Sequence, residues 1–143
     1  MNWTIKTFDQ LTSKEIYEIL RSRAEVFVKE QRISYVDPDG VDYKSWHVFA
    51  TENDKVCAYL RAFKDGDDTI KIGRVLTLIH GKGSGTQLMK YAIRELKAKT
   101  GCKKIIMDAQ SHAISFYQRL GFTITSEEYL EEGIPHVDME LTL

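Results

Sequence analysis

The chain has 143 residues, 43% of them hydrophobic and 29% charged, which is the composition of a globular protein long enough to bury a core. Its 20 basic and 21 acidic side chains nearly cancel, so the charge balance indicates no nucleic-acid partner. No apolar run is long enough to span a membrane and no signal-peptide core follows the N-terminus, so we expect a cytoplasmic protein without a membrane partner.

The first half of the chain predicts one strand, one long helix and three further strands. Residues 2–8 alternate as a short strand, and a capping box from Thr12 to Glu15 starts a helix that continues to about Gln31. Residues 34–45 carry the turn chemistry of a loop. The three strands that follow are expected over residues 46–51, 56–63 and 69–76.

The second half continues with helices and strands in alternation. A helix is expected from Thr86 to Lys99, and another from Ser111 to Leu120 with Gly121 as its stop. The remaining strands are expected over residues 104–108, 122–130 and 137–143. This order predicts an α+β fold, a mixed sheet with helices on its faces. Nothing resembling a linker or repeat interrupts the chain, so residues 1–143 are expected to form a single domain.

The most informative segment is His80-Gly81-Lys82-Gly83-Ser84-Gly85-Thr86, between a β-prone run and an amphipathic helix. Glycine at every second position permits a tight turn and close approach of a ligand. The helix N-terminus directs several N–H groups at one point, where they suit a phosphate, and Lys82 adds a positive charge. The spacing matches neither a P-loop nor a dinucleotide fingerprint. The segment therefore predicts a phosphate site of another kind, with a glycine-rich turn that binds nothing as the alternative.

Cysteine and histidine carry little signal. Cys57 and Cys102 lie among apolar neighbours and predict small buried side chains, with Cys102 as a nucleophile left open. The four histidines are dispersed without ligand spacing, so no metal site is expected.

Two motifs stand on either side of the second long helix and the strand after it. The first reads His80-x-x-Gly83-x-Gly85, and the second runs from Ala113 through Phe116-Tyr117 to Gly121-Phe122. With the element order over nearly the whole chain, they resemble the GNAT superfamily of N-acetyltransferases, and the second motif is much the more specific. A narrower resemblance, to the ElaA-type branch of small bacterial GNAT proteins, rests on residues 23–31, Asp39-Gly40-x-Asp42, Asp108-Ala109-Gln110 and Gly133-Ile134-Pro135-His136.

The resemblance implies a mostly antiparallel sheet of six to seven strands that splays between its fourth and fifth strands. Acetyl-CoA would lie there, with its pantetheine arm in the splay and its pyrophosphate on the glycine loop. An N–H near Leu76 would stabilise negative charge on the carbonyl oxygen. Gln110 would bond the arm, with a strand cap as the equal alternative. The implied cofactor-binding residues are Val75, Leu76, Thr77, His80, Gly81, Lys82, Gly83, Ser84, Gly85, Thr86, Gln110 and Tyr117.

The resemblance makes Tyr117 the expected general acid, because a phenol with a free pKa of about 10 can protonate a departing thiolate. The alternative is that Tyr117 and Phe116 are a core aromatic pair. The general base is less clear, since the part of the fourth strand where many members carry Glu reads Lys71-Ile72-Gly73-Arg74. Glu30 and His136 are the preferred candidates. Asp39, Asp42, His47 and a water chain are the others.

The chain is thus expected to be an acetyl-CoA-dependent N-acetyltransferase that acetylates a primary amine of a small molecule or protein. A non-catalytic acyl-CoA-binding module is the alternative, favoured by the missing acid, by His80 in place of Gln or Arg, and by a seemingly shortened segment from Arg74 to Gly81. Acidic residues between 23 and 43 favour a cationic acceptor. Monomer and homodimer both stay open.

Overall fold

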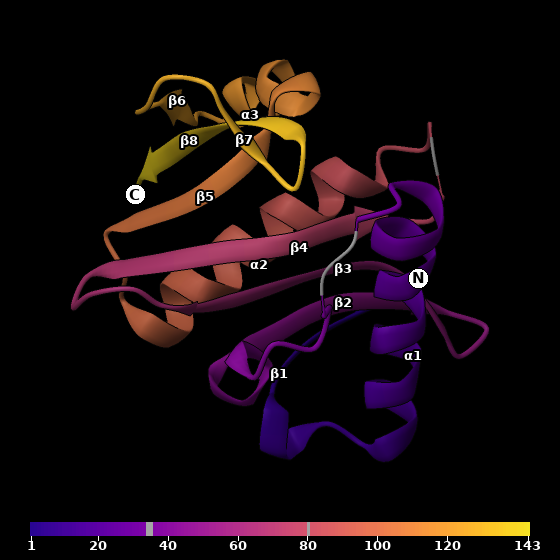
Figure 1. The fold of residues 1–143 in the computed structure, drawn as a ribbon. Coiled ribbons are helices and arrows are strands. Elements are labelled where there is room, and N and C mark those ends of the chain that lie inside the picture. The colour runs from indigo at the N-terminus through magenta and orange to yellow at the C-terminus, as the bar shows by residue number, and fades with distance from the viewer. Residues whose placement is uncertain (34–35, 80) are drawn as a thin grey trace.

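A computed structural model describes residues 1–33, 36–79 and 81–143, and within them one eight-stranded sheet collects every strand (Figure 1). The strand order is β1-β2-β3-β4-β5-β8-β6, with β7 paired to β8. All pairs are antiparallel except β4 with β5, which confirms the mixed, mostly antiparallel sheet. The strands are β1 Asn2–Thr7, β2 Trp46–Glu52, β3 Lys55–Lys64, β4 Thr69–Thr77, β5 Lys104–Gln110, β6 Thr123–Ile124, β7 Tyr129–Glu131 and β8 Ile134–Thr142.

Three α-helices and four 3-10 or π-helical segments connect the strands in the described residues. They are η1 Phe8–Gln10, α1 Ser13–Arg23, η2 Ala24–Glu30, η3 Val41–Lys44, α2 Ser84–Thr100, η4 Ser111–Ala113 and α3 Ile114–Arg119 in the described residues. The predicted capping box is present, because Glu15 N–H donates to Thr12 Oγ1 and Thr12 N–H donates to Glu15 Oε1. None of these helices is long and apolar enough to cross a membrane.

Helices α1 and α2 lie on opposite faces of the sheet (Figure 1), which separates two hydrophobic cores. Side chains alternate between faces along a strand, so Val48 and Leu60 point to one side while Phe49 and Tyr59 point to the other. The first face packs against the buried stripe of α2. The second packs against α1 and η2. Helices therefore pack on both faces of β3 and β4, and these two strands contribute to the site described below.

Strands β4 and β5 pair over only part of their length. Their parallel register runs from Thr69 opposite Lys104 to Ile72 opposite Met107. Beyond that point β4 continues to Thr77 and β5 continues to Gln110 without pairing to each other. This confirms the expected splay between the fourth and fifth strands.

Several expected boundaries were wrong. The expected strand over 122–130 divides into β6 and β7, because Ser126 Oγ accepts the Asp138 N–H and thereby replaces a ladder bond of β8. The sheet therefore has eight strands in the described residues, more than the expected six to seven. Strand β8 also starts earlier than expected, since the positive φ angles of Glu132 (52°) and Gly133 (73°) make a two-residue hairpin turn.

The first long helix reaches the expected end but changes its winding. Its last seven residues, η2, form a π-helix in which Gln31 N–H donates to the carbonyl of Val26 at 3.0 Å. A π-helix rotates the following side chains relative to an α-helix. This rotation accompanies the placement of Phe27 and Gln31 on the cavity described next.

Candidate active site

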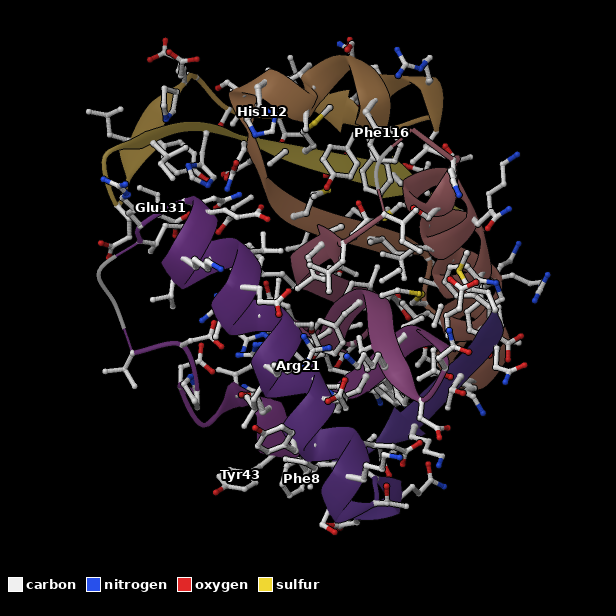
Figure 2. All side chains as sticks on the ribbon, turned by 90° about the vertical axis from the view of Figure 1, so that its right-hand side faces the viewer. Phe8, Arg21, Tyr43, His112, Phe116 and Glu131 are labelled. Carbon is white, nitrogen blue, oxygen red and sulfur yellow. The ribbon has the colours of Figure 1, made fainter. Side chains whose placement is uncertain are left out.

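A cavity of about 470 Å³ lies where β4 and β5 separate. Its walls come from η2, β4, β5, α3 and the β7–β8 turn, and they include Val75, Asp108, Gln110, Tyr117, Glu131 and His136. Figure 2 shows this side: the helix that carries Arg21 runs from Phe8 and Tyr43 toward the side of His112 and Glu131, which both line the cavity. The cavity thus lies between segments that are far apart in the sequence.

A β-bulge shapes the β4 wall of this cavity. Tyr59 of β3 pairs with Leu76, but Arg61 pairs with Gly73, so β4 contains one extra residue between them. Arg74, within the bulge, has a left-handed φ of 51°. Since Leu78 N–H donates to the carbonyl of Cys57 on β3, the alternation directs Leu76 toward β3 as well. The backbone groups of Val75 and Thr77 therefore face the open side, and the N–H expected near Leu76 belongs to Val75 or Thr77.

The glycine loop forms the N-terminus of α2. Gly81 and Gly83 have left-handed φ angles of 76° and 71°, and α2 starts directly after Gly83. The first N–H groups of a helix have no partner within it, and the first turn of α2 contains no acidic residue. Lys82 is exposed beside them. Ser84 is buried and its Oγ donates to the carbonyl of Ile79, so only its backbone N–H can bind an anion.

Gly85 lies against α3 and the end of β4. A Cβ at Gly85 would lie 3.4 Å from Cζ of Phe116 and 3.9 Å from Cγ2 of Thr77. The first turn of α2 therefore packs directly against the Phe-Tyr motif and the end of β4. Free N–H groups, a lysine and the absence of acids fit a phosphorylated ligand on this loop. Of the predicted loop residues, His80 lies outside the described residues.

Tyr117 is brought to the cavity by α3. Its side chain is only 6% exposed and packs edge-on against Phe116 and Phe122, with ring centroids 5.1 and 5.8 Å away. Burial raises the pKa of its phenol to about 12. Among the residues that the structure describes, its hydroxyl has no hydrogen-bond partner, and it is not among the fully buried polar atoms, so it is accessible from the cavity. Tyr117 is therefore both a core aromatic and a cavity-lining hydroxyl.

Gln110 lies at the end of β5 and spans the mouth of the splay. Its Nε2 donates to Gln31 Oε1 at 3.0 Å, and its Oε1 accepts from His112 Nε2 at 2.7 Å. Both polar ends of the amide are thus used, one by Gln31 just after η2 and the other by His112 of η4. The amide lines the cavity while it ties these two segments together.

Two of the base candidates, Asp39 and Asp42, belong to a network of ion pairs that holds residues 36–45, a segment called the strap below. Arg23, fully buried, contacts Asp37 at 2.9 Å and Asp42 at 2.6 Å. Arg61 contacts Asp39 at 2.7 Å and Asp42 at 3.1 Å. The hydrogen bonds from Arg61 lower the pKa of Asp39 to about 2. Both carboxylates therefore pair with arginines. Asp39 lines the cavity, whereas Asp42 does not.

His47 is also held inside this network. Its Nδ1 lies 2.7 Å from the hydroxyl of Tyr59, and its Nε2 lies 2.9 Å from the carbonyl of Asp42. Burial lowers the pKa of His47. His47 does not line the cavity. Its contacts are those of a residue that anchors the strap to β2 and β3.

The two preferred base candidates end up in different places. Glu30 is exposed at the end of η2 and does not line the cavity. His136 lines the cavity with 7% of its surface exposed. Its Nδ1 lies 2.7 Å from the carbonyl of Ile134, and its ring stacks on Tyr129. The structure therefore brings His136 together with Val75, Gln110 and Tyr117, and leaves Glu30 outside.

Other sequence-based expectations are also changed by the geometry. The acids of the strap pair with Arg23, Arg61 and Arg74, so they no longer argue for a cationic acceptor. Cys102 is buried away from the cavity wall. The β4 residues on the wall, from Lys71 to Val75, include no acid. Across the described ranges, no group of three or more His, Cys, Asp or Glu side chains could hold a metal ion.

Comparison with known proteins identifies the family. The model of the acetyltransferase (GNAT) domain matches residues 9–143. The chain belongs to this family. Protein ElaA of Escherichia coli is 34% identical over 97% of this chain and 95% of its own. A UPF0039 protein of Schizosaccharomyces pombe is 35% identical over 100% of this chain and 98% of its own.

Solved structures agree with this assignment. The crystal structure of E. coli ElaA covers 98% of each chain with a TM-score of 0.92 and 32% identity. An acyl-CoA N-acyltransferase from Pseudomonas aeruginosa has a TM-score of 0.90 and 35% identity, over 99% of this chain and 100% of its own. The GNAT chain described here is accordingly of the ElaA type, and its family is that of the N-acetyltransferases, whose cofactor is acetyl-CoA.

The cavity also contains side chains that sequence reasoning did not select as site residues. Lys71 and Asp108 pair across the floor of the splay at 3.2 Å, and Gln31, Arg61 and Glu131 line its walls. Only two of them had a usable signal: Asp108 and Gln31 lie in segments shared with the ElaA branch. The others come together through strand register and the π-helix, which local patterns do not report.

Proposed function

We propose that this GNAT chain acts as a single domain over residues 1–143, and that it transfers the acetyl group of acetyl-CoA directly to a primary amine of a small molecule or protein. Tyr117 would be the general acid. The observation that supports this most is the Tyr117 hydroxyl, which belongs to a residue that is only 6% exposed, has no partner among the described residues, and lies on the wall of the cavity at the splay.

The residues that would hold acetyl-CoA follow from the free backbone groups. The N–H groups of Ser84, Gly85 and Thr86, with Lys82 beside them, suit its pyrophosphate. The open backbone of Val75 and Thr77 suits the amides of its arm. Acetyl-CoA supplies a thioester, whose carbonyl carbon is the electrophile. A backbone N–H aimed at the carbonyl oxygen contributes about 2.7–4 kcal/mol in comparable sites, and the N–H of Val75 is our candidate.

Two side chains would move protons. The raised pKa of Tyr117, about 12, keeps its phenol protonated at neutral pH, as a proton donor to sulfur requires. His136 would take a proton from the amine, because it lines the same cavity and Glu30 does not. Gln110, held by Gln31 and His112, would fix the width of the opening.

A non-catalytic acyl-CoA-binding module is the second candidate. It is supported by the absence of an acid among the β4 residues that line the cavity. Both candidates predict that coenzyme A binds, but only the enzyme should turn over acetyl-CoA.

The experiment is acetyl-CoA turnover, followed as free thiol, against polyamines, amino sugars, amino acids and lysine peptides, with coenzyme A binding measured by calorimetry. Thiol release that depends on an amine supports the enzyme. Tight binding with no release for any class of amine supports the module. If coenzyme A does not bind, the assignment of the glycine loop is wrong and both candidates fail.

A further inference from the structure

The β7–β8 hairpin places a carboxylate beside the only nitrogen of His136 that can accept a proton. Tyr129 pairs with His136 across the hairpin, and Glu131 is two residues beyond Tyr129, so all three side chains lie on one face. That face forms part of the cavity wall, since Glu131 and His136 both line it.

The tautomer of His136 follows from its hydrogen bond. Nδ1 lies 2.7 Å from the carbonyl oxygen of Ile134, and a carbonyl can only accept, so Nδ1 carries the hydrogen. Neutral His136 therefore keeps its lone pair on Nε2. Nε2 makes no hydrogen bond to the described residues and lies 3.5 Å from Glu131 Oε2. The side chain of His136 is only 9% exposed, whereas that of Glu131 is 51% exposed.

A lone pair and a carboxylate at this separation repel each other unless Nε2 is protonated or a hydrogen-bond donor, such as a water or a cation, bridges the two. An ammonium group can bridge the two acceptors, because it donates one N–H to Nε2 and another to Glu131, and its positive charge also neutralises the carboxylate. We propose, on the basis of the proposed function, that Glu131 and His136 together receive the acceptor as an ammonium. Glu131 is a positioning residue that attracts and orients the cation, and His136 takes its proton.

The proton transfer balances without another reagent. One N–H bond of the ammonium breaks, its electron pair stays on nitrogen as the nucleophilic lone pair, and the proton binds Nε2. The imidazolium then lies beside the Glu131 carboxylate and releases its proton to solvent through the exposed side of that residue. Net release of one proton is what acetylation of an ammonium by a thioester requires.

The other charged groups around His136 are already engaged or lie elsewhere. Tyr129 donates its hydroxyl to Asp138 at 2.6 Å, and Asp108 pairs with Lys71 at 3.2 Å. Gln110, opposite His136 on β5, is neutral. Glu132 also lines the cavity, but it sits on the turn and makes no ion pair with His136. This makes Glu132 a matched control for Glu131.

The first test is binding of ethylammonium, with the imidazole signals of His136 followed by NMR in the folded protein. Wild type and Glu132→Gln should show a saturable shift with dissociation constants within about twofold of each other. Glu131→Gln should bind about three- to fivefold more weakly, as loss of one partly exposed ion pair predicts. Equal binding by Glu131→Gln and Glu132→Gln, or no shift at His136 in wild type, overturns the proposal. This arm needs no turnover, so it fails independently of the proposed function.

The second test compares acetyl transfer to ethylamine and to trifluoroethylamine, which is similar in shape but far less basic. Glu131→Gln should lower kcat/KM for ethylamine about tenfold and change that for trifluoroethylamine less than about twofold, because the weak base arrives already neutral. The KM for acetyl-CoA should not change. An equal loss for both amines would mean that Glu131 is merely structural.

Discussion

Arg74 donates through Nε to Asp37 Oδ1 at 3.0 Å while its own backbone holds a left-handed φ of 51°. Arg74 belongs to the bulge of β4 and Asp37 to the strap. A second contact joins Arg74 Nη2 to Asp39 of the strap at 3.4 Å. A left-handed conformation costs a residue other than glycine about 1–2 kcal/mol. The ion pairs therefore offset local strain at the residue that precedes Val75, where the open edge of β4 begins.

Arg74→Gly and Arg74→Ala separate the two contributions. Both variants lose the ion pairs, but glycine adopts a positive φ freely and alanine does not. We expect Arg74→Ala to be about 1 kcal/mol less stable than Arg74→Gly in urea unfolding. Equal stabilities would show that the bulge relaxes when the guanidinium is removed.

The glycine loop gives a prediction with an internal control. Gly83 and Gly101 cap the two ends of α2 with φ angles of 71° and 66°, and a Cβ at either would meet nothing within 4 Å. Alanine at either position should cost a similar ~1 kcal/mol of stability. Only Gly83→Ala should weaken coenzyme A binding, by about tenfold or more, because only that end directs free N–H groups at the ligand. Calorimetry on both variants checks this, and equal affinities would place the pyrophosphate elsewhere.

Acid should destabilise the strap. The hydrogen bonds from Arg61 depress the pKa of Asp39 from 3.8 to about 2, so the folded form binds fewer protons than the unfolded form between these values. The stabilisation is complete above about pH 4 and is lost as the pH falls through 2. Asp39→Asn should be less stable at pH 7 and should show a shallower loss of stability in acid. Asp54→Asn, which removes an exposed carboxylate, should match wild type.

Alkali should also destabilise the protein, through Tyr117, whose pKa is raised where that of Asp39 is lowered. Burial raises the pKa of its phenol from 10 to about 12, so the folded state holds the proton longer than the unfolded state. Stability should therefore fall as the pH rises above 10. Tyr117→Phe should lose less stability than wild type between pH 10 and 11, measured by urea unfolding. A control variant, Tyr17→Phe, changes an exposed tyrosine and should behave as wild type.

Local patterns predicted the parts of this protein that depend on local chemistry. The capping box at Thr12, the glycine loop before α2 and the stop at Gly121 all follow from residues within one or two turns of each other. The Phe-Tyr motif contains Tyr117, which lies on the cavity wall.

Features that depend on distant partners could not be read in this way. The ion pair between Arg23 and Asp42 joins residues 19 apart, and Arg61 reaches Asp39 across 22. The extra residue at Arg74 and the π-helix of η2 are adjustments of register, and no composition signal marks them. As a result the sequence could not show that Asp39 and Asp42 pair with Arg61, or that His47 contacts the carbonyl of Asp42.

The most direct test of the account is the steady-state kinetics of Tyr117→Phe with the best amine of the panel. This substitution removes the phenolic hydroxyl, which is the proposed proton donor, and leaves the ring packed against Phe116 and Phe122. The account predicts that kcat falls by about 100-fold or more while the KM for acetyl-CoA changes less than about threefold. A variant with kcat within twofold of wild type would contradict it, and would leave Tyr117 as a core aromatic only.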